Sequence, residues 1–472
     1  MTNPVDRRRP EDPARVTPMP DLRRFDRRQL MRTLSHVSWD PKGKVCDVVG
    51  TIIEANLPGA QLGTAVSIAV GGPRPEVLAE VVGFRKERAL LLPLGNLAGI
   101  APGCTVTAKR MYDRVRIGSH LLGKIVDPML ETLTGETLTE ADDTADMPID
   151  RDAPNPMQRR RIENQLGLGI RAMDGLLTFG EGQRIGVMAG AGVGKSVMMG
   201  MIAQGSSSDI NVIALLGERG REVREFLERD LGPEGLARSV VVVVTSDQSP
   251  LMKIRGAKVA TSIAEYFSGQ GKRVLLMLDS LTRVAMAQRE IGSAVQEPPT
   301  TKGYPPSTFA LLPRLLERCG PQAKGRGSIS GLYTVLVDGD DFNDPIPDAA
   351  RGILDGHINL SRKLAEKGHY PAIEVTSSTS RVMYDIVPKE HWQAATRIKS
   401  LLAVYQQNFD YVQIGSYQPG SNPQLDLALQ MMPAIERYLR QEKSELSTPQ
   451  DALKGLLALA GSTPQVNVPR GA

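Results

Sequence analysis

The chain has 472 residues, more than a single hydrophobic core usually serves, so two or three domains are expected. Its 41% hydrophobic and 23% charged residues are typical of a globular protein, and a net charge of +4 is too small to indicate a nucleic-acid binder. Aromatic residues make up only 4%, which argues against a surface that stacks bases, so we expect no nucleic-acid partner.

The cysteines and the hydropathy pattern bear on the compartment. Cys46, Cys104 and Cys319 are odd in number, with no metal-ligand spacing and no disulfide framework, which favours a reducing cytoplasm. No run approaches eighteen apolar residues, and MTNPVDRRRPEDPAR lacks the apolar core of a signal peptide. We therefore expect a cytoplasmic protein, docked on something larger.

The N-terminal region, residues 1–43, is rich in arginine and proline. Its run DLRRFDRRQLMRTLSHV would place apolar residues on one broad face of a helix and most arginines on another. Three interpretations stay open, namely a disordered basic tail, a helix that docks on a partner protein, and a helix that binds a membrane surface.

Residues 44–112 consist of short apolar runs separated by glycine and proline, such as CDVVGTIIEA, AVSIAV and EVLAEVVGF. Alternation over four to eight residues with frequent turn signals predicts a small β-barrel or sandwich. A purely structural module is favoured over a ligand-binding barrel.

Residues 113–383 alternate apolar strands with helical stretches. The runs RIGVMA, NVIALLG, SVVVVVT, RVLLMLD and GLYTVLV are continuous and of strand length, as in buried parallel strands. Helical segments such as GAKVATSIAEYFSG lie between them, which predicts an α/β domain with a mainly parallel sheet. Residues 384–472 carry mostly helical patterns, including HWQAATRIKSLLAVYQQ, and predict a C-terminal helical domain.

A phosphate-binding loop follows the first of these strands. GAGVGKS matches the pattern G-x-x-x-x-G-K-[ST] except that Ala189 stands at its first glycine, where a methyl group is tolerated if this residue still belongs to the strand. The glycines let backbone N–H groups point at phosphate oxygens beside a helix N-terminus. The residues predicted to bind nucleotide along the loop are Ala189, Gly190, Ala191, Gly192, Val193, Gly194, Lys195, Ser196 and Val197.

The loop implies ATP and Mg²⁺ as cofactors. Lys195 would reach the β- and γ-phosphates, and the hydroxyl of Ser196 would ligate the metal. Asp279 ends the strand RVLLMLD, where a carboxylate can hold Mg²⁺ through water, and Glu222 is the further carboxylate assigned to the metal.

Glu218 directly follows the strand NVIALLG in the run GERGREVREF. A carboxylate there can polarise the attacking water as general base. The alternative is a solvated, charged helix start, an interpretation that also suits the nearby Arg221.

Several longer segments resemble the catalytic subunits of rotary ATPases, and most closely the ATPases of flagellar and type III protein export. They are GIRAMDGLLTFGEGQRIGVMAGAGVGKS, GERGREVREFLERDLG, LLMLDSLTRVAMAQREI, EPPTTKGYPPSTFALLPRLLER, DDFNDPIPDAARGILDGHINLSRKLAEKGHYPAIEV and SSTSRVM. AMAQREI and GYPPS favour the export ATPases over the proton-pumping relatives.

The resemblance implies a homohexameric ring with nucleotide bound between subunits. By this likeness Arg219 and Arg283 line the phosphate end, and Tyr370 in GHYPAIEV packs on adenine. Arg381 in STSRVM matches the arginine finger that enters the neighbouring subunit's site. The alternatives are a core tyrosine for Tyr370 and a structural ion pair for Arg381.

The function implied is an ATP-driven motor that delivers, unfolds or releases export substrates. The resemblance further implies a stator-type regulator at the N-terminal helix, a central stalk protein, a membrane export gate, chaperone–substrate complexes, and peripheral association with the inner membrane. The alternatives are a subunit of a proton-coupled rotary ATPase, a Rho-type ring RNA translocase, and a nucleotide-binding assembly protein with little turnover.

Overall fold

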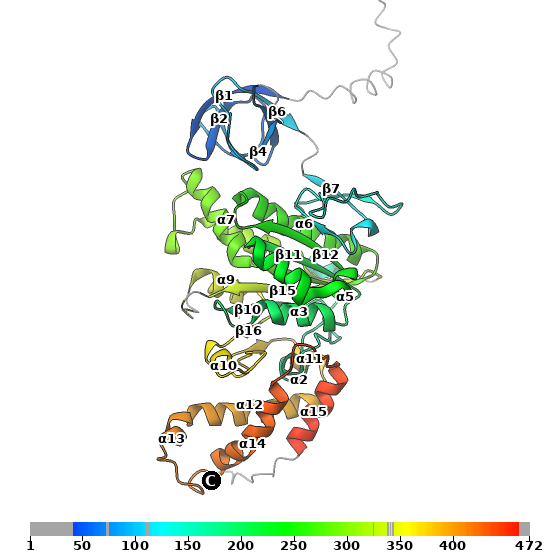
Figure 1. Ribbon diagram of the computed structural model, residues 1–472, viewed down its shortest axis with the longest axis vertical. Helices are drawn as coiled ribbons and strands as arrows, with labels where there is room; N and C mark the ends of the chain where they lie inside the picture. Colours follow the sequence, from blue (N-terminus) through cyan, green and yellow to red (C-terminus); the bar gives the residue numbers. More distant parts are fainter. Residues whose placement is uncertain are drawn as a thin grey trace, which may run out of the picture.

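The computed structural model describes residues 41–71, 75–109, 113–323, 325–337, 339, 341 and 344–461. The predicted helix at DLRRFDRRQLMRTLSHV lies outside these residues. A β-barrel, an α/β region and a helical region follow one another along the long axis of the molecule (Figure 1). No helix within the described ranges is long and apolar enough to cross a membrane.

The β-barrel confirms the architecture expected for the first apolar region. Its strands are β1 (Lys42–Val49), β2 (Ile52–Asn56), β3 (Ala65–Ala69), β4 (Val77–Arg85), β5 (Arg88–Pro93) and β6 (Thr105–Lys109). They close in the order β1-β2-β5-β4-β3-β6, so no strand edge stays open. Alternate side chains such as Val66 and Ile68 fill a small core of their own, while Ile52, Leu90 and Leu92 join the core of the α/β region.

The segment that links the barrel to the main sheet differs from the predicted alternation of strands and helices. Here β7 (Arg114–Ile117) pairs with β9 (Ala145–Pro148), and β8 (Ile125–Val126) extends the main sheet beside β12. The first α-helix described after the barrel is α2 (Arg171–Leu176). Strands of two to four residues are too short for hydrophobic periodicity to reveal.

The main sheet has the order β17-β16-β10-β15-β13-β11-β12-β8, with β14 paired to β15 outside this path. Its strands are β10 (Arg184–Ala189), β11 (Ile210–Glu218), β12 (Ser239–Thr245), β13 (Arg273–Asp279), β14 (Gly320–Pro321), β15 (Ser328–Leu336), β16 (Gly356–Asn359) and β17 (Thr379–Ser380). All five apolar runs predicted as strands form the parallel centre of this sheet. Since β14 and β17 pair antiparallel, the sheet is mainly parallel, as expected.

Helices cover both faces of the sheet, because neighbouring side chains on a strand point to opposite sides. On β11, Val212 belongs to one core and Ile213 to the other. The helices are α3 (Lys195–Gly205), α4 (Gly220–Glu225), the π-helix η4 (Phe226–Leu231), α5 (Gly232–Ala237), α6 (Pro250–Gly269), α7 (Leu281–Ala294), α8 (Pro306–Leu316), α9 (Pro345–Ile353) and α10 (Arg362–Glu366), with short 3₁₀ turns η2 (Ser119–Leu121), η3 (Pro156–Gln158) and η5 (Thr301–Gly303). Ser249 and Ser280 cap α6 and α7 by accepting backbone N–H groups of the first turn.

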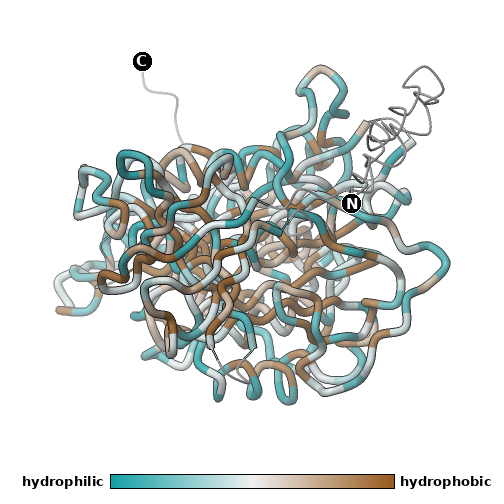
Figure 2. Tube along the Cα trace, turned by 90° about the horizontal axis from the view of Figure 1, so that it is seen from above, coloured by the Kyte–Doolittle hydropathy of each residue, from teal (hydrophilic) through white to brown (hydrophobic). Residues whose placement is uncertain are grey.

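The C-terminal region is helical, as predicted. It consists of α11 (Met383–Ile386), α12 (Lys389–Gln407), α13 (Phe409–Gln413), α14 (Pro423–Leu439) and α15 (Pro449–Gly461). Apolar residues of α12, α14 and α15 share one core with α2 and with Met198 and Met199 of α3. The helix that follows the phosphate loop therefore packs in the same core as the C-terminal helices, and hydrophobic stretches gather inside the trace while hydrophilic loops face outward (Figure 2).

Candidate functional site

The phosphate loop has the backbone that its glycines predict. Strand β10 ends at Ala189, so the methyl group that departs from the motif is buried at the strand end, as expected. Gly192 and Gly194 have φ values of 77° and 88°, a backbone conformation that residues other than glycine rarely adopt. Helix α3 begins at Lys195, which leaves the first backbone N–H groups of the helix free for an anion.

Three charged side chains predicted for the nucleotide site, Lys195 and Glu218 for catalysis and Asp279 for the metal, meet at the carboxyl edge of the sheet. The Nζ of Lys195 lies 2.5 Å from Oδ1 of Asp279 and 3.4 Å from Oε1 of Glu218. Glu218 and Asp279 are the last residues of the neighbouring parallel strands β11 and β13, which explains why residues far apart in sequence converge. The side chains of Lys195 and Glu218 are 13% exposed and that of Asp279 is 4% exposed, so this cluster is largely shielded from water.

The pKa shifts of this cluster have clear physical causes. Burial lowers the pKa of Lys195, but the charges of Asp279 and Glu218 together outweigh it, so the pKa is raised and the ammonium stays protonated. Burial raises the pKa of Glu218; Lys195 opposes this rise and a hydrogen bond with Glu222 adds to it. A raised pKa brings the carboxylate closer to the basicity that a general base needs.

The residues at the loop fit a magnesium nucleotide. Ser196 stands in the first turn of α3 and follows Lys195, whose Nζ contacts Asp279 at the end of β13, so a hydroxyl and a carboxylate oxygen are available near the loop, the donors that Mg²⁺ prefers. No group of three or more His, Cys, Asp or Glu side chains that could hold a metal occurs among the described residues. A magnesium ion here would thus take its remaining ligands from phosphate and water, which is its usual coordination at nucleotide sites.

Arg219 and Arg283, both expected at the phosphate end, lie differently. Arg219 is 82% exposed, and its guanidinium is 3.8 Å from the carboxylate of Glu222. The side chain of Arg283 packs against Gly217. A Cβ placed on that glycine would lie only 3.2 Å from the Arg283 side chain, so the absence of a Cβ permits this close contact. Arg283 therefore lies beside Gly217, the residue that precedes Glu218, whereas the side chain of Arg219 is exposed to solvent.

Arg381 lies at the opposite edge of the sheet from the phosphate loop. Its backbone N–H donates to the carbonyl of Asp355, which directly precedes β16, and its guanidinium donates to the carbonyl of Arg351. Strand β16 runs parallel to β10, and Asp355 also accepts from Arg184 at the start of β10. Since the phosphate loop follows the end of β10, one chain does not bring Arg381 to its own Lys195.

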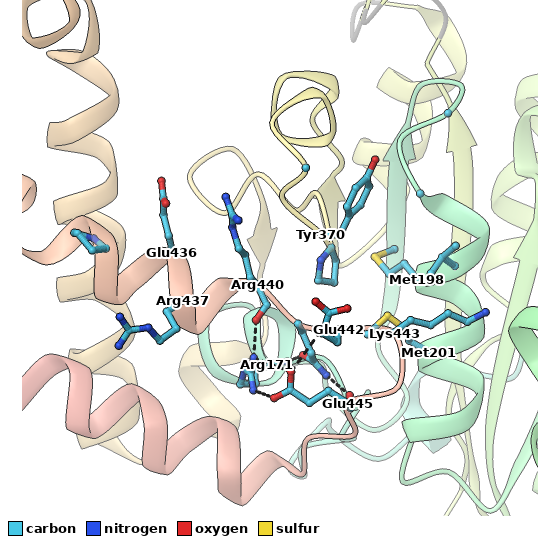
Figure 3. A pocket seen from close by; sticks show the side chains of 17 residues that line it. Arg171, Met198, Met201, Tyr370, Glu436, Arg437, Arg440, Glu442, Lys443 and Glu445 are labelled. Atoms are coloured by element: carbon cyan, nitrogen blue, oxygen red, sulfur yellow. Dashed lines mark hydrogen bonds and ion pairs between the residues drawn. The ribbon is translucent and has the colours of Figure 1, made fainter.

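Tyr370 borders a cavity of about 860 Å³ beside the loop (Figure 3). The residue is 46% exposed, and a Cβ placed on Gly194 would lie 3.3 Å from its ring, so the glycine permits the close approach of ring and loop. Val197 and Met198 of α3 form the neighbouring wall. This open aromatic face contradicts the interpretation of Tyr370 as a core residue.

The opposite wall of the cavity comes mainly from the C-terminal region, and the sequence did not reveal it. Its charged members from that region are Glu436, Arg437, Arg440, Glu442, Lys443 and Glu445, and Arg171 of α2 joins them (Figure 3). Gln441 ties this wall to the loop side, since its backbone N–H donates to the carbonyl of Tyr370 at 3.0 Å. Its buried amide accepts from the backbone N–H of Arg171, 270 residues earlier, so no local pattern could have indicated the contact.

One further residue near the cluster was missed. Thr334 lies in the strand β15, and its hydroxyl is 2.6 Å from Oδ1 of Asp279. The signal was available, because Thr334 is a polar residue in the apolar run GLYTVLV.

Comparisons with known families cover three parts of the chain. Residues 45–110 match the β-barrel domain of the ATP synthase alpha/beta family, and residues 169–380 match its nucleotide-binding domain. Residues 387–458 match the C-terminal domain of the T3SS EscN ATPase. These matches fall within the domains expected from the sequence, whose precise boundaries stay a prediction.

Whole-length similarity extends to individual proteins. The flagellum-specific ATP synthase of Bacillus subtilis (strain 168) is 50% identical over 426 residues, which are 90% of this chain and 96% of that protein. The type 3 secretion system ATPase of Xanthomonas euvesicatoria is 48% identical over 417 residues, 88% of this chain and 93% of that protein.

Solved structures of type III secretion ATPases show the same similarity at the level of the fold. The assembled ATPase EscN of the enteropathogenic E. coli type III secretion system superposes with a TM-score of 0.82 at 41% identity, over 89% of this chain and 100% of that one. The same ATPase in complex with its central stalk EscO gives a TM-score of 0.80 over the same shares.

Proposed function

The chain belongs to the family of flagellum-specific and type III secretion system ATPases, and from this premise we propose that it works as a homohexameric motor of a flagellar-type protein export apparatus. It is an ATP hydrolase. The match of its C-terminal region to the secretion ATPases favours export over proton pumping.

One observation carries the proposed ring. Lys195, Glu218 and Asp279 meet at one edge of the sheet, while Arg381 lies at the other edge. A second copy, set with the Arg381 edge against the loop edge of the first, would supply the cation that this cluster lacks. Hydrolysis would then depend on assembly, since each site takes its arginine from a neighbour.

The residues of the chain divide the chemical work among themselves. Magnesium, held by Ser196 and Asp279 with Glu222 nearby, would neutralise phosphate charge when bound. Lys195 exchanges its carboxylate partners for the β- and γ-phosphates. Glu218, released from Lys195, orients the attacking water and accepts its proton, and Arg381 of the neighbour stabilises the charge that develops on the phosphoryl oxygens.

The base end of the nucleotide would lie in the cavity beside Tyr370, with adenine on the exposed ring. We assign Arg283, whose side chain packs against Gly217, to the support of the cluster, and Arg219, whose side chain is 82% exposed, to contact with a neighbouring chain.

The proposed partners extend beyond the ring. EscN, which this chain resembles, was solved with a central stalk protein, and we assign an equivalent stalk to this chain. A stator-type regulator at the N-terminal segment, an export gate and chaperone–substrate complexes complete the proposal, with the protein in the cytoplasm at the inner membrane.

Mixing two inactive variants tests the shared site. Arg381→Ala should lower the ATPase rate by about 10³- to 10⁵-fold, and Lys195→Ala should abolish it. Rings that contain both variants have interfaces where an intact Lys195 meets an intact Arg381, so mixing should restore part of the activity. Arg221→Ala, which removes another solvent-facing arginine, serves as control and should behave like the unaltered protein. Absence of recovery in rings verified to contain both chains would contradict a finger acting between subunits.

A further inference from the structure

Thr334 lies on β15 directly beside the end of β13. The register of the two strands pairs Leu278 with Tyr333, so Thr334 stands next to Asp279 where the paired segment ends. Its side chain is fully buried, and both flanking residues, Tyr333 and Val335, are buried in the core. A buried hydroxyl is costly without a hydrogen bond, so the partner of this one decides what the residue does.

The partner is the carboxylate of Asp279. The hydroxyl of Thr334 donates to Oδ1 of Asp279 at 2.6 Å, whereas its distance to the carbonyl of Leu278 is 3.4 Å. A hydroxyl has a single proton to donate, and a hydrogen bond to an ionised acceptor is the stronger one. Oδ1 of Asp279 thus receives two donors, Thr334 and Lys195.

These two donors differ in what happens to them when nucleotide binds. Lys195 is shared with Glu218 and has phosphate to move to, whereas Thr334 is fixed in the middle of the sheet. Once Lys195 leaves, Thr334 stays on Oδ1 and keeps the carboxylate from rotating.

We propose that Thr334 is a positioning residue for magnesium-dependent nucleotide binding, acting through Asp279. This inference rests on the proposed function, in which Asp279 supports the metal. It predicts that loss of the Thr334 hydroxyl weakens nucleotide binding when Mg²⁺ is present and does not change nucleotide binding when Mg²⁺ is absent.

The test separates positioning from simple structural support. Thr334→Val keeps the branched shape and removes the donor, and Thr334→Ser keeps the donor and removes the methyl group. Affinity for a fluorescent ADP analogue is measured in Mg²⁺ and in EDTA, together with the Mg²⁺ concentration that half-activates hydrolysis. For Thr334→Val we expect the Mg²⁺-dependent gain in affinity to fall by about 10- to 100-fold, the loss of one hydrogen bond to a charged group, with affinity in EDTA unchanged. Thr334→Ser should restore the gain.

Matched variants make the result decisive. Thr308→Val removes another fully buried threonine hydroxyl, which has no hydrogen-bond partner among the described residues, and should leave the Mg²⁺ dependence intact. Thr334→Ala is measured in parallel, so that the conclusion does not depend on the folding of one variant. A folded Thr334→Val or Thr334→Ala protein with the full Mg²⁺-dependent gain overturns the inference.

Asp279→Asn distinguishes failure of this inference from failure of the proposed site. If Asp279→Asn keeps the Mg²⁺-dependent gain, the metal role of Asp279 is wrong and the inference about Thr334 falls with it. If Asp279→Asn loses the gain while Thr334→Val retains it, the proposed site stands and only the role of Thr334 is refuted.

Discussion

The two ends of the candidate nucleotide site are built in contrasting ways. At the phosphate end, Lys195, Glu218 and Asp279 are largely buried, joined to one another, and fixed by the ends of parallel strands. At the base end, Tyr370 is half exposed, and the facing wall comes mainly from the C-terminal helical region. One sheet therefore sets the chemistry, whereas the fit of the base depends on how the C-terminal helices sit against the sheet.

This contrast has a kinetic meaning. Groups that are preorganised around the reacting atoms act mainly on kcat, and groups that hold a remote part of the substrate act mainly on KM. Substitutions at the two ends should consequently separate into two classes.

Glu218→Gln should have a larger effect than a substitution at the base end, and this effect should appear in kcat rather than in nucleotide affinity. Loss of the general base is expected to lower kcat by about 10²- to 10⁴-fold while nucleotide affinity changes little, because the amide keeps the shape of the side chain. Phosphate release and binding of a fluorescent nucleotide measure the two quantities. Glu225→Gln, an exposed carboxylate paired with Arg221, is the control. A normal kcat at saturating ATP would remove Glu218 from the chemical step.

Tyr370→Ala should shift KM and leave kcat nearly unchanged. Stacking of a base on an aromatic ring contributes about 1–3 kcal/mol, so KM for ATP is expected to rise by about 5- to 150-fold. Tyr370→Phe retains the ring and should behave like the unaltered protein. If kcat falls as strongly as kcat/KM, the two ends are not separable and the contrast fails.

The pH dependence should give the smallest and most specific effect. Burial raises the pKa of Glu218, and only its ionised form accepts a proton from water. Hydrolysis should therefore fall on acidification with a midpoint above the pKa of about 4.3 of an ordinary glutamate. The profile of kcat/KM reports the free enzyme, in which Glu218 faces Lys195. The acidic limb should vanish in the residual activity of Glu218→Gln and persist in Glu225→Gln; its persistence in both would assign it to another group.

The phosphate end was predictable because strand ends can be recognised in the sequence. RVLLMLD and NVIALLGE each end in a carboxylate, and parallel strands bring their carboxyl ends to one edge, so the convergence of Glu218 and Asp279 on the loop follows from local patterns. Thr334 was within reach as a hydroxyl in an apolar strand, but its partner depends on strand order, which hydropathy does not give. The wall that contains Arg440 and Lys443 was beyond reach, since a contact between domains leaves no periodicity in either.

The pairing of Lys195 with two carboxylates has a consequence for ligand selection. An ammonium that already has internal counter-ions is a poor trap for free anions, because an incoming phosphate must displace negative charges that stay buried beside it. In the proposed roles, a nucleotide that arrives with its own divalent cation would give Asp279 a positive partner in exchange for the lysine it takes. The site should therefore discriminate against bare polyanions and in favour of the metal complex before any catalytic step begins.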